Sequence, residues 1–122
     1  MSFRWKNASA DQILLYQCIS LLLGYDKRLI EFVFDPGKPK IRKRAGILRE
    51  DAFFFSHGEQ LLIRAALDFW SGSGQLALWE MLEVWDSATW NRFTHAVSEY
   101  RRLELEESRR TEAKKAEGSS LC

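Results

Sequence analysis

The sequence predicts an all-α protein, a compact bundle of about five to six helices that ends in a polar helical tail. Apolar residues recur at helical spacing in several segments, and a Ser or Asp in a capping position precedes the clearest of them. Hydrophobic residues make up 46% of the 122 residues. A chain of this length and composition can bury a core without a metal or disulfides.

The first helix is predicted to begin at Ser9 and to stop at Gly24. Ser9 and Gln12 have the spacing of a capping box, in which each side chain accepts a hydrogen bond from the backbone of the other residue. Gly24 can adopt the left-handed conformation that ends many helices. Between these two signals, the residues of the expected core-facing stripe are Ile13, Leu14, Cys18, Leu21 and Leu22.

Residues 29–45 allow two interpretations. Residues 29–34 are rich in β-branched and aromatic side chains, which favour a strand. The turn signal at residues 35–38 would then allow a short β-hairpin near residues 29–45. A lone hairpin lacks the neighbouring elements that would stabilise it, so we favour a short helix and keep the hairpin as the alternative.

A second capping-box pattern, Ser56 with Glu59, directly precedes an apolar run that extends to Trp70. The segment from Phe55 to Leu61 resembles the signature loop of ABC-type ATPases, whose Ser and Gly amides cap a nucleotide phosphate. That family also requires a glycine-rich phosphate loop with Lys and an apolar strand that ends in acidic residues. Because this chain contains neither, we interpret the pattern as an ordinary helix cap, and residues 71–74 as the end of that helix.

Two further helices are predicted after this cap. A helix over residues 75–84 is expected to carry Leu78, Leu82 and Trp85 on one side, and Asp86 is expected to cap a long final helix. Trp85 and Trp90 occupy the two positions of a hydrophobic staple around that cap. The apolar stripe of the final helix is Trp90, Phe93, Val97 and Tyr100.

The apolar pattern also sets the predicted domain organisation. The stripe ends at Leu105, and the residues that follow are mainly charged and small. Such a segment can continue as a solvated helix but cannot bury a face. We therefore expect a single helical domain at residues 1–105 and a charged tail at residues 106–122.

Few residues are available for chemistry. The chain has two histidines, His57 and His95, and neither has a partner at a recognised metal-ligand spacing. No glycine-rich phosphate loop with Lys is present, and no Ser or Cys stands in a catalytic pattern. We therefore expect no enzymatic activity, no metal, no cofactor and no small-molecule ligand.

The composition also bears on location. Cys18 and Cys122 do not make a disulfide framework, which favours a reducing compartment. The longest nearly apolar run, residues 13–23, is too short to cross a bilayer, and the first residues lack the apolar stretch of a signal peptide. We therefore expect a cytoplasmic protein without membrane contact.

The first functional hypothesis is a non-enzymatic interaction or regulatory module. Residues 65–99 contain five acidic residues against one base, Arg92, and four of the five tryptophans of the chain. Trp is rarely buried completely and is enriched at binding hot spots. A protein partner or a second subunit would dock on the acidic helices, and the candidate contact residues are Trp79, Glu80, Glu83 and Trp85.

The alternative hypothesis is a small nucleic-acid-binding protein. Six basic residues fall within residues 38–49, although the formal net charge of the chain is only +1. Each phosphate contact would add salt-dependent affinity. A helix-turn-helix-like pair at residues 75–100 would add Arg92, and the other candidate contacts are Lys38, Lys40, Arg42, Lys43, Arg44 and Arg49.

Overall fold

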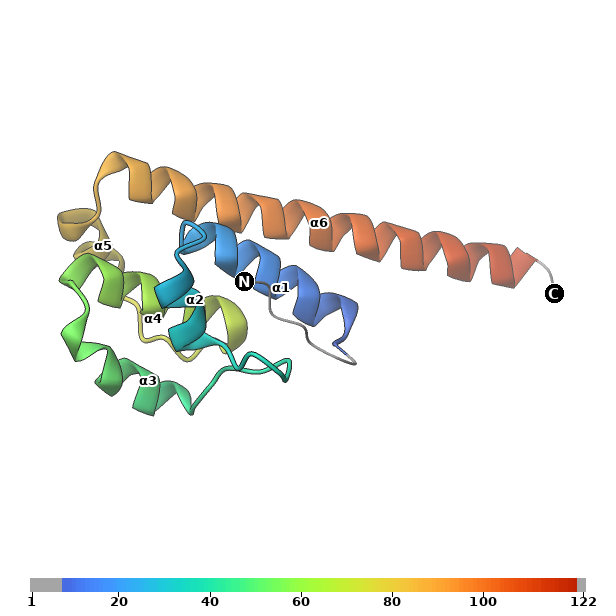
Figure 1. Ribbon diagram of the computed structural model, residues 1–122. Coiled ribbons are helices and arrows are strands. Elements are labelled where there is room, and N and C mark those ends of the chain that lie inside the picture. Colours follow the sequence, from blue (N-terminus) through green and yellow to red (C-terminus); the bar gives the residue numbers. More distant parts are fainter. Residues whose placement is uncertain (1–7, 121–122) are drawn as a thin grey trace.

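The computed structural model describes the backbone of residues 8–120 and the side chains of residues 8–110. Within these residues the chain is all-α, with six α-helices, one 3₁₀ turn and no strand (Figure 1). This confirms the predicted fold class. The elements are α1 (Ala10–Leu22), α2 (Lys27–Val33), α3 (Ala45–Asp51), the 3₁₀ turn η1 (Ala52–Phe54), α4 (His57–Ser71), α5 (Leu78–Val84) and α6 (Ser87–Ser120).

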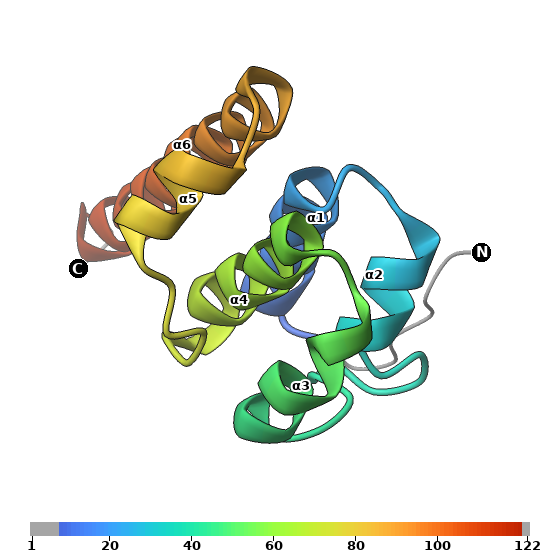
Figure 2. The same cartoon turned by 90° about the vertical axis from the view of Figure 1, so that its left-hand side faces the viewer.

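Helix α4 supplies the largest part of the core. It contacts α1, α2, α3 and α5, while α1 also packs along α6 (Figure 2). Both Ile19 and Leu22 of α1 are fully buried in this arrangement. The buried residues of α4 are Leu61, Leu62, Ile63, Ala65, Ala66 and Leu67.

The three predicted helix caps are confirmed. Ser9 forms a capping box with Gln12, and Ser56 forms one with Glu59. The Asp86 carboxylate accepts a hydrogen bond of 2.8 Å from the backbone N–H of Thr89 in the first turn of α6. Caps are predictable because they depend on residues only three positions apart.

The ambiguous segment forms a helix. Asp26 caps α2 by accepting the backbone N–H of Arg28, and Leu29 and Val33 are buried one turn apart. The alternative hairpin is reduced to a single antiparallel bridge between Phe34 and Ile41. Burying an apolar stripe of α2 against α4 stabilises this segment more than an isolated hairpin would.

The predicted start of α5 is wrong by three residues. Gln75 has a positive φ of 55°, outside the helical region, and the helix begins at Leu78. The preceding loop folds back onto α4: the backbone N–H of Gly74 donates to Asp68, and a Cβ at Gly74 would lie 1.8 Å from the carbonyl oxygen of Arg64. This contact across the fold fixes the loop and delays the helix.

Helix α6 is continuous from Ser87 to Ser120 and extends well beyond the other helices (Figure 1). Its inner face near α1 carries fully buried Ala96, whereas Val97, expected in the apolar stripe, is 42% exposed. Further along, Arg102 pairs with Glu99 and Glu106 on the solvent side. The backbone therefore passes residue 105, the predicted domain boundary, without a break.

Candidate interaction surfaces

Helix α5 turns one face inward and the other to solvent. Met81 is 2% exposed and Trp85, directly after the helix, is 7% exposed. The indole N–H of Trp85 donates to the carbonyl oxygen of Gly58 at the start of α4, over 3.2 Å. The outward residues Leu78, Trp79 and Leu82 are each more than 60% exposed, and we call these three residues the α5 patch.

This arrangement corrects two sequence predictions. Leu78, Leu82 and Trp85 do not share a side, because the buried pair is Met81 and Trp85. Trp85 also cannot be an exposed anchor, since its ring packs against Trp90 and Phe93 in the core. The segment contains two apolar pairs at helical spacing, Leu78 with Leu82 and Met81 with Trp85. The fold buries the second pair, which contacts α4.

Carboxylates flank the α5 patch. Glu80 lies 3.5 Å from the imidazole of His57, the first residue of α4, and Glu83 is exposed. No basic residue occurs between positions 65 and 91. Of the four residues predicted to bind a partner, the structure therefore places Trp79, Glu80 and Glu83 around one outward face and Trp85 in the core.

A second exposed apolar surface lies at η1, which the sequence analysis did not single out. Phe53 is 79% exposed and Phe54 is 65% exposed, and we call these two residues the phenylalanine patch. Phe54 contacts the rings of Phe53, Phe55 and Phe32, which hold it in place. The sequence signal that could have identified this patch is the run of three phenylalanines directly before the capping Ser56, of which only Phe55 is half-buried in the structure.

A shallow groove of about 560 Å³ runs beside Phe54 and Phe55. Arg28 and Arg42 line it together with two carboxylates. The Arg28 guanidinium donates to Glu59 over 2.7 Å, and Arg42 donates to a backbone carbonyl of α2, so both side chains are held close to the groove. The groove thus joins the phenylalanine patch to the basic segment.

The basic segment is exposed, as a surface for anions requires. Lys43 pairs with Asp51, and the Arg49 guanidinium donates to the backbone of Ser73. Arg49 is consequently half-buried and helps to hold the loop after α4. The exposed members of the segment are Lys38, Lys40, Arg42, Lys43 and Arg44.

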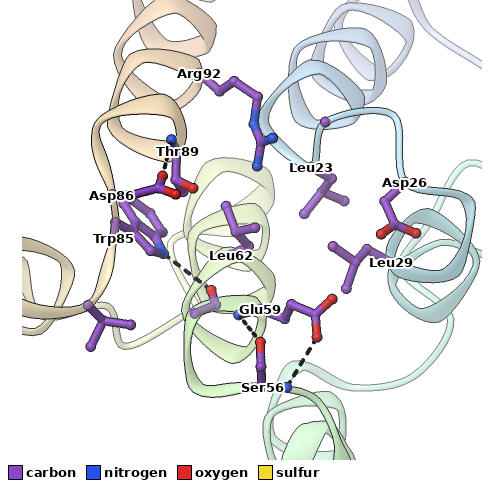
Figure 3. Close-up of a pocket in the computed structure, with 13 residues that line it drawn as sticks. Leu23, Asp26, Leu29, Ser56, Glu59, Leu62, Trp85, Asp86, Thr89 and Arg92 are labelled. Atoms are coloured by element: carbon purple, nitrogen blue, oxygen red, sulfur yellow. Dashed lines mark hydrogen bonds between the residues drawn. The ribbon is translucent and has the colours of Figure 1, made fainter.

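Arg92 is half-buried, whereas the helix-turn-helix interpretation expects it to project from the surface of the final helix. Its guanidinium points into a cavity of about 380 Å³ between the turn after α1, α2, the start of α4 and the start of α6 (Figure 3). The Arg92 Nε is buried without a hydrogen-bond partner in the described part of the chain, and a Cβ at Gly24 would lie 2.9 Å from Nη1. Arg92 therefore puts a cation beside the C-terminal end of α1, where the helix dipole favours positive charge.

The carboxylates around this cavity already have partners. The backbone N–H of Ser56 donates to Glu59 and is the largest cause of the lowered pKa of that carboxyl. The Asp86 pKa is lowered chiefly by the backbone N–H of Thr89, and the Asp26 pKa by the side chain of Arg28. All three groups are ionised at neutral pH and poorly suited to donate a proton.

Another cavity, of about 790 Å³, lies between α1 and α6 and brings together Cys18, His95 and Glu99. Burial, together with the charge of Glu99, raises the pKa of the Cys18 thiol. A nucleophilic cysteine needs the opposite shift, toward the thiolate. His57 lies elsewhere, beside Glu80, so the three residues His57, His95 and Cys18 do not converge.

Comparison with known proteins finds no matching family model, no matching curated protein and no matching solved structure. In the part of the chain that the structure describes, no three His, Cys, Asp or Glu side chains gather in a way that could hold a metal ion. None of the described helices is both long and apolar enough to cross a membrane.

Proposed function

We propose that this chain is a non-enzymatic protein-interaction module that docks a protein partner through α5. The observation that carries the proposal is the α5 patch, in which Leu78, Trp79 and Leu82 are 61%, 63% and 63% exposed on a helix of seven residues. Single exposed apolar residues are ordinary on protein surfaces, but a contiguous group of large ones marks an interaction site. Trp at the centre of such a group is the residue type most enriched at hot spots.

The inward face of α5 explains why the outward face is available. Met81 and Trp85 anchor the segment to α4, so the fold does not need the α5 patch for its own stability. Exposed Glu83 and half-buried Glu80 beside the patch would favour a partner with a basic or neutral rim.

The test compares substitutions of exposed residues that leave the core intact. Trp79→Ala and Leu82→Ala should abolish capture of the partner in a pull-down while the thermal unfolding curve stays unchanged. Leu105→Ala is the matched control, because Leu105 is 40% exposed on α6, outside the α5 patch. Equal capture by wild type, Trp79→Ala and Leu82→Ala would refute the proposal.

A second candidate function is phosphate-mediated binding of nucleic acid, favoured by the exposure of five basic residues in the segment 38–49. Affinity for a DNA or RNA duplex should then fall steeply with salt. The triple substitution of Arg42, Lys43 and Arg44 to Ala should lower that salt slope by about three, since roughly one counterion is released for each phosphate contact. An unchanged slope would exclude this segment as the contact surface.

A further inference from the structure

Both exposed apolar patches lie at the same end of the molecule. The turn between α3 and α4 carries the phenylalanine patch, and this turn and α5 both face the viewer in Figure 2. Phe54 precedes His57 by three residues, and His57 lies 3.5 Å from Glu80, the neighbour of Trp79. This end of a small domain thus presents two large apolar surfaces, one on each side of the start of α4, and nothing in the described chain covers them (Figure 2).

The two patches have opposite electrostatic surroundings. The α5 patch is accompanied by Glu80 and Glu83, with no base nearby in the sequence. The phenylalanine patch borders the groove that Arg28, Arg42, Glu31 and Glu59 line. Arg28 pairs with Asp26 and Glu59, so within the described residues the unpaired positive charge beside the patch is that of exposed Arg42. An apolar helix with an exposed carboxylate, Glu83, and an aromatic surface with an exposed arginine, Arg42, are complementary in both charge and hydrophobicity.

We infer that the partner of this end is a second copy of the chain, and the inference rests on the proposed function of the α5 patch. In a two-fold symmetric dimer, a contact between surface i and surface j occurs twice. An axis that passes between the two patches places the α5 patch of each copy on the phenylalanine patch of the other. Glu83 beside the α5 patch then faces Arg42 of the groove in both halves of the interface.

The size of the patches is sufficient for such a dimer. Each copy contributes three exposed aromatic rings, Phe53, Phe54 and Trp79, and two exposed leucines. An aromatic side chain buries about 150–250 Å² when it is covered completely. The two copies together therefore supply roughly 1,000 Å² from these residues alone, which is near the lower bound for a specific interface.

The first experiment is sedimentation equilibrium of the full chain over a range of concentrations. Wild type should show a species of twice the 14.2 kDa chain mass. Leu82→Asp and Phe54→Asp should each raise the dissociation constant by at least about tenfold, as expected when a hot spot is lost. Leu105→Asp, the same change at an exposed leucine of α6, should leave it unchanged. If Phe54→Asp perturbs the circular dichroism spectrum, Phe53→Asp replaces it, because Phe53 is more exposed.

The second experiment tests whether the α5 patch of one copy contacts the phenylalanine patch of the other. Glu83→Lys makes the α5 side more basic, and Arg42→Glu makes the groove more acidic. Each variant alone should dimerise more weakly than wild type, because each pairs like charges across both halves of the interface. Mixed in equal amounts, the two variants should form a heterodimer in which one half has wild-type charges and the other has both charges reversed. Failure of the mixture to recover dimer overturns the pairing of the two patches.

The outcomes separate this inference from the proposed function. A wild-type chain that is monomeric at every concentration overturns the dimer, yet Trp79-dependent capture of a different protein would still support docking through α5. A dimer that is insensitive to Leu82→Asp and Phe54→Asp overturns the assignment of both patches. Insensitivity to Phe54→Asp alone leaves α5 as the contact and removes the phenylalanine patch from it.

Discussion

The contrast between Trp79 and Trp85 gives the sharpest test of the structure. Trp85→Ala removes a ring that is 7% exposed, its contacts with Trp90 and Phe93, and the hydrogen bond to Gly58. Truncation of a buried Trp costs about 3–5 kcal/mol, and the abandoned hydrogen bond accounts for about 1 kcal/mol of that. Small domains have about 5–15 kcal/mol of stability, so the variant should be close to unfolding.

The assay is urea unfolding followed by circular dichroism, which does not depend on the fluorescence of the substituted residue. Trp79→Ala, at a side chain that is 63% exposed, should change the free energy of unfolding by less than about 1 kcal/mol. Trp85→Phe retains a ring but not the N–H donor, so its loss of unfolding free energy should lie between those of Trp79→Ala and Trp85→Ala. Equal destabilisation by Trp79→Ala and Trp85→Ala would refute the assignment of α5's inner and outer faces.

Two further predictions concern the loop after α4 and the cap before it. Gly74→Ala should lower the free energy of unfolding by about 2 kcal/mol or more, because its Cβ would meet the backbone of Arg64. Gly72→Ala has open space around its Cβ but a φ of 70°, so it should lower the free energy of unfolding by only about 1 kcal/mol. The urea unfolding midpoints of the two variants test this difference. The pKa of Glu59 is lowered in the folded state, mainly by the N–H of Ser56, so its stabilising contribution is present above the unfolded pKa and lost as pH falls through the folded pKa. The urea midpoint of wild type should therefore decrease as pH falls through the folded pKa of Glu59, and the decrease should be smaller in Glu59→Gln, which keeps the cap without the charge.

Local signals in the sequence were sufficient for the starts of α1, α4 and α6 and for the end of α1. Ser9, Ser56 and Asp86 cap the helices that they were predicted to cap, and Gly24 adopts the left-handed conformation. Each of these features depends on residues that are near one another in the chain. The start of α5 depends instead on Gly74 meeting a helix of the earlier chain, and no spacing rule records that contact.

The position of Arg92 also depends on a contact between distant parts of the chain, which sequence spacing cannot predict. Its spacing on α6 fits a residue that faces a DNA groove, and its chemistry fits base recognition. The fold instead places the C-terminal end of α1 beside it, and the absent side chain of Gly24 leaves room for the guanidinium. Only the pairing of α1 with α6, a contact between distant parts of the chain, decides that Arg92 is half-buried.

Helical periodicity alone could not decide which apolar residues of α5 are buried and which form the candidate site. The sequence of α5 contains two apolar stripes, and the buried one, Met81 with Trp85, is enough to attach the helix to α4. The side chains left outside add little to folding, and exposed apolar groups favour aggregation. Phe53 of the phenylalanine patch likewise adds little to folding, because Phe55 and Phe32 already pack together without it. A docking surface, as we propose, would give these large side chains at one end of the molecule a role that the fold itself does not give them.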